Sequence, residues 1–150
     1  MTENLQTIRE LYESGFASIP KEQGVYFITA PEGWHPAFQS TFFRPAKRPC
    51  SPYPAKLLEA KYQIQGCPQL LYIGKAGGRC GLRQRLRQYI RHGYGEVGNH
   101  MGGRAIWQSP NCETLLVSWE MCPHPDAREH QLLLQFRQQF GDYPLANWRG

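Results

Sequence analysis

Several polar side chains stand beside predicted strands and helices in positions where they could do chemistry on a phosphate. Tyr26 and Tyr72 each lie near a glycine in a short apolar run. Arg85 and Glu129 lie on later amphipathic segments, and Asn147 comes near the end of the chain. A guanidinium binds phosphate oxygens, and a carboxylate binds hard divalent cations. This combination predicts metal-dependent cleavage of a phosphodiester.

Arg85 faces inward on its predicted helix. It follows Leu82 by three positions and precedes Tyr89 by four, so it lies beside the apolar stripe of that helix. An arginine in this position can reach one particular phosphate. The alternative is a structural ion pair with Glu129 or Asp126.

A basic surface is predicted around the same helix. Between residues 75 and 104 only Glu96 opposes the cationic side chains. A local cationic field of this kind attracts a polyanion, most often nucleic acid, although a solvated helix face is the plain alternative. The residues at 83, 87 and 91, spaced by four, form an outward ridge. The candidate nucleic-acid contacts are Arg79, Arg83, Arg87, Arg91, His100 and Arg104.

Glu129 shares a helical face with Leu132, Leu133 and Phe136, so its carboxylate is directed at or near the core. A partly buried carboxylate is costly unless it is paired or bound to a cation. Either Arg85 neutralises it or a divalent ion does, and oxygen ligands suit Mg²⁺ or Mn²⁺. With one carboxylate, we expect a single metal that keeps several waters.

Tyr26 and Tyr72, taken singly, are ordinary strand tyrosines. Lys75, soon after the second, could lower the pKa of a neighbouring phenol by charge proximity. A phenolate base is then conceivable. His100, near a pair of glycines, is a candidate for phosphate contact or proton transfer.

Length and composition predict a single folded domain over residues 1–150. Hydrophobic residues make up 41% of the chain and charged residues 19%, with a net charge of +5. This is typical of an ordered globule. No apolar run reaches the length of a membrane span and the N-terminus is no signal peptide, so we expect a cytoplasmic protein without membrane contact. The five cysteines form no C-x-x-C pair, which argues against disulfides and a zinc ribbon.

Local periodicity predicts an α+β chain. The expected strands cover 24–29, 70–74 and 114–120, and the expected helices cover about 3–14, 81–92 and 125–140. A Pro-rich insertion, about 30–68, contains a helix-like patch at 56–62. So long an irregular stretch is either functional or a disordered excursion. As a functional segment it would contact substrate or a second copy of the chain.

The order of these motifs resembles that of the GIY-YIG nuclease superfamily, in particular its small stand-alone bacterial members. The resemblance runs from about residue 24 to residue 147. Its motifs are Gly-Val-Tyr at 24–26, Leu-Tyr-Ile-Gly-Lys-Ala at 71–76, Gly-Leu-Arg-Gln-Arg-Leu at 81–86 with Tyr89, Glu129 on a Leu-rich helix, and 144–147.

The resemblance implies a small α/β domain with a central three-stranded antiparallel sheet flanked by helices, which hydrolyses phosphodiesters with one Mg²⁺ or Mn²⁺. Arg85 would stabilise the transition state and Glu129 would hold the metal. Tyr89 stands where some members have histidine. The remaining implied roles are general base or its close partner for Tyr26, orientation of water or phosphate for Tyr72, charge or proton handling for Lys75, and hydrogen bonding to a loop or to the metal's water shell for Asn147.

We therefore expect an endonuclease acting on branched, damaged or deformed DNA, with RNA as a second candidate substrate. It would act alone, as a homodimer or with a recognition partner protein. One alternative is a catalytically silent nucleic-acid-binding module of the same fold. The other is an enzyme outside nucleic-acid chemistry, with a cysteine nucleophile and a buried pair between Arg85 and Glu129.

Overall fold

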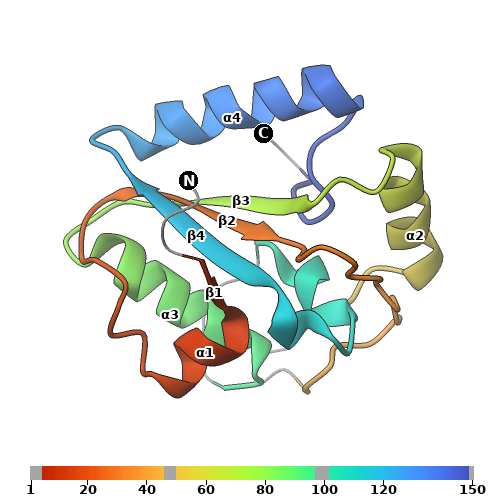
Figure 1. Cartoon of the computed structure of the whole chain (residues 1–150), viewed down its shortest axis with the longest axis horizontal. Helices are drawn as coiled ribbons and strands as arrows, with labels where there is room; N and C mark the ends of the chain where they lie inside the picture. The colour runs from red at the N-terminus through yellow and green to blue at the C-terminus, as the bar shows by residue number, and fades with distance from the viewer. Residues whose placement is uncertain (1–4, 46–49, 97–101, 149–150) are drawn as a thin grey trace.

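A computed structural model describes residues 5–45, 50–96 and 102–148 of the chain. Its strands form one antiparallel sheet in the order β1-β4-β2-β3, with helices on both faces (Figure 1). The mixed α+β class is therefore confirmed. The strands are β1 (Gln6–Thr7), β2 (Gly24–Thr29), β3 (Leu70–Ala76) and β4 (Leu116–Met121).

The expected three-stranded sheet is wrong by one strand, because the two-residue β1 adds to β4 as a fourth. Gln6 pairs with Val117 and Thr7 with Leu116. Two residues are too few to show an alternating pattern, so this strand could not be read from the sequence. The expected strand at 114–120 also begins later, because Cys112–Thr114 forms a 3₁₀ turn, η2.

The two tyrosine motifs pair directly, although the long insertion separates them in sequence. β2 lies in the middle of the sheet, antiparallel to both β3 and β4. Tyr26 lies opposite Gly74 of β3 and opposite Trp119 of β4. Five of the six residues of β2 are buried, as its apolar residues on both faces predict.

Helices cover both faces of the sheet (Figure 1). α1 (Ile8–Glu13) and α3 (Gly81–Gly93) lie on one face, where the larger core includes Tyr26, Tyr72 and Tyr89. α4 (Pro125–Phe140) crosses the other face over a smaller core that includes Val25 and Ile73. No helix among the described residues has both the length and the apolarity needed to cross a membrane.

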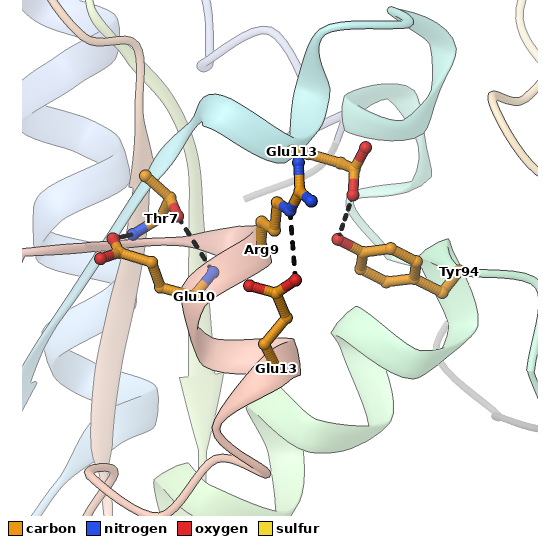
Figure 2. A network of polar contacts seen from close by, with 6 residues as sticks. All are labelled: Thr7, Arg9, Glu10, Glu13, Tyr94 and Glu113. Carbon is orange, nitrogen blue, oxygen red and sulfur yellow. Dashed lines mark hydrogen bonds and ion pairs between the residues drawn. The ribbon is translucent and has the colours of Figure 1, made fainter.

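The N-terminal helix is shorter than the expected 3–14 and begins at Ile8. Thr7 is its N-cap: its Oγ1 accepts from the Glu10 amide at 3.0 Å, and the Glu10 carboxylate accepts from the Thr7 amide at 2.8 Å (Figure 2). This capping box satisfies amides that have no partner inside the helix. Thr7 is therefore both the last residue of β1 and the N-cap of α1.

A ring stack between Tyr12 and Tyr94 holds α1 against the end of α3, and two polar contacts lie beside it. Figure 2 shows the Arg9 guanidinium donating to the Glu13 carboxylate at 3.3 Å and the Tyr94 hydroxyl donating to Glu113 at 2.6 Å. The rings of Tyr12 and Tyr94 stack with centroids 3.8 Å apart. α1 is therefore packed on the domain through Ile8, Leu11 and the Tyr12 ring.

The Pro-rich insertion is ordered in its described parts, 30–45 and 50–68, which does not fit a disordered excursion there. Its helix-like patch is α2 (Ala55–Ile64). The insertion packs on a 3₁₀ turn, η1 (Arg104–Gln108), and the contacts are made by Gln108, the buried last residue of η1. The Gln108 side chain donates to the carbonyls of Gln39 and Tyr53, each at 2.7 Å, and accepts from the Tyr53 amide at 2.8 Å.

Candidate functional site

Tyr26 lies in van der Waals contact with the strand opposite, because the facing residue is a glycine. A Cβ at Gly74 would come within 2.2 Å of Tyr26 Cζ, so the ring occupies the space of a missing side chain. The Tyr26 side chain is fully buried. The glycine of one motif and the tyrosine of the other thus form a single packing unit across β2 and β3.

Tyr72 has a similar neighbour from a distant part of the chain. A Cβ at Gly103, whose φ is +73°, would lie 2.7 Å from Tyr72 Cζ. The Tyr89 ring stacks on Tyr72 with centroids 5.4 Å apart, and its hydroxyl donates to the Gly103 carbonyl at 2.8 Å. Tyr89 is fully buried, so its contacts here position Tyr72 and the loop beside it.

Burial controls the ionisation of the two strand tyrosines. It raises the pKa of Tyr26 well above its usual value and that of Tyr72 to about 12, while the Arg85 charge lowers both. The hydrogen-bonding interaction between the two side chains raises the pKa of Tyr26 and lowers that of Tyr72. These surroundings disfavour a phenolate at either position, because burial favours the protonated phenol.

Lys75, Asp126 and Glu129 form a cluster between the end of β3 and the first turns of α4. Lys75 Nζ lies 2.9 Å from Asp126 Oδ1 and 3.8 Å from Glu129 Oε1. The Glu129 side chain is only 18% exposed, against 86% for Asp126. Burial raises the pKa of Glu129, and the neighbouring ammonium opposes this. The expected inward carboxylate is therefore present, but its described ion-pair partner is Lys75 and not Arg85.

The tyrosines and the lysine cluster lie within electrostatic range of one another, although they are on opposite faces of the sheet. The Glu129 charge raises the pKa of both Tyr26 and Tyr72, and the Arg85 charge acts on both phenols and on Lys75. Figure 1 shows α3 and α4 starting at the same end of the sheet, where β3 ends. Residues from four elements thus meet within electrostatic range.

Asn147 binds the outer edge of β3 instead of pointing at the phenols. Its amide group donates to the Ile73 carbonyl and accepts from the Ile73 amide, both at 2.9 Å. It is 7% exposed. Of the two roles expected for Asn147, the structure therefore supports hydrogen bonding that fixes a segment, here the C-terminal segment beside Tyr72.

The expected ridge of three outward arginines is wrong for two of its members. Arg83 donates to the carbonyls of Ile19 at 2.6 Å and Ala17 at 3.1 Å. Arg91 pairs with Glu96 at 2.9 Å. The helical spacing correctly predicts that these residues lie outside the core. They are not free in solvent, because the segment before β2 and the turn after α3 contact them.

The other predicted nucleic-acid contacts are distributed over several surfaces. Arg87 and Arg79 are exposed, and Arg79 borders an open hollow of about 480 Å³ together with Lys21, which the sequence did not single out. Arg104 is partly buried against the insertion. His100 lies outside the described residues.

Few side chains among the described residues could bind Mg²⁺ or Mn²⁺. The described part of the chain holds no cluster of three or more His, Cys, Asp or Glu side chains suited to a metal. Glu129 and the exposed Asp126, one turn earlier on α4, supply carboxylate oxygens only. Burial of Glu129 penalises its negative charge, and a cation would relieve that penalty. This set fits a hard ion that keeps most of its waters, and it does not fit zinc.

The cysteines give little support to thiol chemistry. Burial raises the pKa of Cys50, Cys112 and Cys122, which disfavours the thiolate that a nucleophile requires. The described ion pairs also do not include the one between Arg85 and Glu129 on which this alternative relied.

Comparisons of the chain with protein-family models, with curated proteins and with solved structures found no match. The candidate site therefore rests on its motifs and its geometry. Two contributors were missed in the sequence: Gly103, which supports Tyr72, and Asp126 as the partner of Lys75. The helical spacing of Asp126 and Glu129 could have indicated the second, whereas nothing local pointed to the first.

Proposed function

We propose that this protein is a metal-dependent endonuclease that hydrolyses DNA phosphodiester bonds, with a preference for branched or deformed DNA over a defined sequence. The observation that supports it best is a mostly buried carboxylate, Glu129, beside Lys75 near the end of β3, within electrostatic range of the two buried tyrosines, on which the Arg85 charge also acts. A negative phosphate needs cationic and donor groups placed in advance, and hydrolysis needs them to bind its transition state more strongly than its ground state.

The roles follow from the surroundings of each side chain. Arg85 binds a non-bridging oxygen of the target phosphate and stabilises the charge that builds there during attack. Because burial keeps the Tyr72 hydroxyl protonated, it can donate a hydrogen bond to a phosphate oxygen or to the attacking water. Lys75 holds Asp126 and keeps Glu129 ionised by charge proximity. Tyr89 and Asn147 position Tyr72 from two sides.

Glu129, with help from Asp126, would hold one Mg²⁺ or Mn²⁺, which supplies a Lewis acid for the phosphate and lowers the pKa of bound water. Water adds to phosphorus, the P–O3′ bond breaks, and the 3′ oxygen leaves as a hydroxyl after taking up a proton. The expected products carry a 5′-phosphate and a 3′-hydroxyl.

Glu129→Gln tests this function because it keeps the shape and removes the charge. Supercoiled plasmid and labelled forked DNA are incubated with Mg²⁺ or Mn²⁺, and cleavage rates are compared with wild type. We expect the variant to lose about a hundredfold or more of the rate, the loss typical of removing a transition-state contact. Arg85→Lys should lose activity similarly, since lysine cannot make a bidentate contact.

Glu59→Gln is the matched control, because Glu59 is an exposed glutamate on α2. It should cut at the wild-type rate. Equal cleavage by wild type and Glu129→Gln, or cleavage that persists in excess chelator, would rule out the proposed chemistry.

A second candidate function is nucleic-acid binding without cleavage, and one contact favours it. Lys75 already lies between Asp126 and Glu129, so these carboxylates are partly neutralised without a metal. Titration calorimetry with Mn²⁺ separates the two functions. A nuclease should show Mn²⁺ binding that Glu129→Gln abolishes, whereas a silent module should bind DNA with strong salt dependence and show no such metal response.

A further inference from the structure

Four side chains from separate parts of the chain form a stacked column, which we call the cation–aromatic column. Arg104 Cζ lies 4.3 Å from the centroid of the Tyr53 ring. That ring stacks on Trp148 with centroids 4.7 Å apart and planes 26° from parallel. Lys61 Nζ lies 3.9 Å from the Trp148 centroid. Two aromatic rings are thus placed between two cations, and each contact has the geometry of an attractive stacking or cation–π interaction.

Both cations of the column are held in place by backbone carbonyls. Arg104 Nε donates to the Ser51 carbonyl at 2.9 Å, and Lys61 Nζ donates to the Asn147 carbonyl at 2.7 Å. The hydrogen bond at Nε and the ring beneath together fix the plane of the Arg104 guanidinium. A ligand that used this plane would meet a side chain that has already lost its freedom, which lowers the entropic cost of binding.

The column stands next to the proposed cleavage site. Arg104 follows Gly103, the residue in contact with the Tyr72 ring. Trp148 follows Asn147, whose amide group binds Ile73 on the outer edge of β3. Arg104 and Trp148 are therefore each one residue away from a group that touches Tyr72 or its neighbour in the chain.

The composition of the column favours an unpaired nucleobase as its ligand. Single-stranded nucleic acid is bound by aromatic rings and guanidinium planes that stack on bases, combined with cations that attract the phosphates. Trp148 is 36% exposed, although a column that only fastened the C-terminal segment would be expected to bury it. Among the described residues, Asp142 is the acid whose charge acts on Lys61. Lys61 lies at the opposite end of the column from Arg104.

We propose that the cation–aromatic column binds an unpaired nucleotide of the DNA substrate next to the bond that is cut. The base stacks on the outer face of the Arg104 guanidinium and continues the stack of Tyr53 and Trp148. A paired base is already stacked inside its duplex and cannot take this place. The inference rests on the proposed nuclease function and gives its preference for deformed DNA a physical cause.

The test measures binding in chelator, where no cleavage occurs. Fluorescence anisotropy compares a labelled DNA carrying a single-stranded arm, the fully paired duplex, and copies of the first with one abasic position moved along the arm. An abasic nucleotide keeps its phosphate and loses only the base. At one position we expect it to weaken wild-type binding by roughly tenfold, within the range of one lost stacking contact.

Arg104→Lys keeps the positive charge and removes the planar group. It should bind the intact arm roughly tenfold more weakly than wild type, lose the abasic penalty, and leave duplex affinity nearly unchanged. Arg87→Lys, the same change at an exposed arginine of α3, should keep the full penalty. Far-UV circular dichroism and thermal melting check that both variants fold.

No abasic penalty in wild type at any position, or the same penalty in Arg104→Lys, would overturn the inference. Equal affinity for the single-stranded arm and the duplex would do so as well. Because the abasic comparison uses the unaltered protein, it stands even if a variant folds poorly. A base-dependent preference without cleavage would refute the nuclease function alone, and cleavage without base dependence would refute the column alone.

Discussion

Gly74 and Gly103 explain at the scale of single residues how the rings of Tyr26 and Tyr72 are accommodated. Each glycine provides the space in which a tyrosine ring lies: Tyr26 above Gly74 and Tyr72 above Gly103. A tyrosine on its own would be an ordinary strand residue. With both rings held in this way, their centroids lie 6.0 Å apart.

Replacing Gly74 with alanine should therefore disturb the packing of the Tyr26 ring. The new Cβ would lie 2.2 Å from Tyr26 Cζ, so the ring must move. We expect the free energy of unfolding to fall by about 1–3 kcal/mol, as for overpacked cores. Urea unfolding measures this. Gly77→Ala is the control, since the nearest atom would be 3.9 Å away, and equal stability of the two variants would contradict the packing described.

At the scale of elements, the edge of the sheet at β3 is protected by a side chain. Edge strands expose unpaired amides and carbonyls, and proteins cover or interrupt them. Here Asn147 makes both hydrogen bonds that a neighbouring strand would make to Ile73, and the Ala146 amide donates to the Leu71 carbonyl at 2.9 Å. The C-terminal segment thus completes the sheet beside Tyr72.

Asn147→Ala should leave the amide and carbonyl of Ile73 without these partners. We expect a loss of about 1–3 kcal/mol in stability, the cost of an unsatisfied buried polar group. Native-state hydrogen exchange gives a local readout: the Ile73 amide should exchange much faster in the variant, while that of Phe27 in the central strand should follow global stability. Unchanged exchange at Ile73 would show that the edge is protected by other means.

At the scale of the whole molecule, the positive charge is less available than the composition suggests. Of the predicted nucleic-acid contacts, Arg83 and Arg91 serve the fold through Ile19, Ala17 and Glu96. Arg79 and Arg87 remain exposed. The electrostatic contribution to DNA binding should therefore come from fewer cations than the sequence count implies.

A buried histidine makes the stability of the whole domain depend on pH. His92 is 4% exposed, neither ring nitrogen has a hydrogen-bond partner among the described residues, and burial lowers its pKa from 6.5. Arg44 and Cys50 line the same small cavity. Because the unfolded chain takes up this proton more readily, stability should fall as pH drops below about 6.5, by at most about 1.4 kcal/mol per pH unit.

Urea unfolding between pH 7 and pH 5 measures this loss. His92→Leu should lose the part of the slope that this imidazole contributes, whatever its absolute stability. His130, an exposed histidine on α4, offers the matched control His130→Leu, which should keep the wild-type slope. Identical slopes in wild type and His92→Leu would contradict the assignment.

The sequence by itself determined the longer elements and the inward faces of the key residues. The strand at 24–29 and the helix at 125–140 have the expected bounds, because side-chain periodicity is a local property that each segment carries alone. For the same reason the half-buried position of Glu129 could be predicted. The fold class also follows from these elements.

Only the tertiary structure decided which side chains meet. Three sets of contacts join segments that are far apart in the chain. They are the ion pair of Lys75 with Glu129, the hydrogen bonds of Asn147 with Ile73, and the stack of Arg104, Tyr53, Trp148 and Lys61. No local pattern encodes such contacts, because they follow from how the sheet, its helices and the insertion pack together. The residues of the candidate site could thus be proposed from the sequence, but their partners in the fold could not.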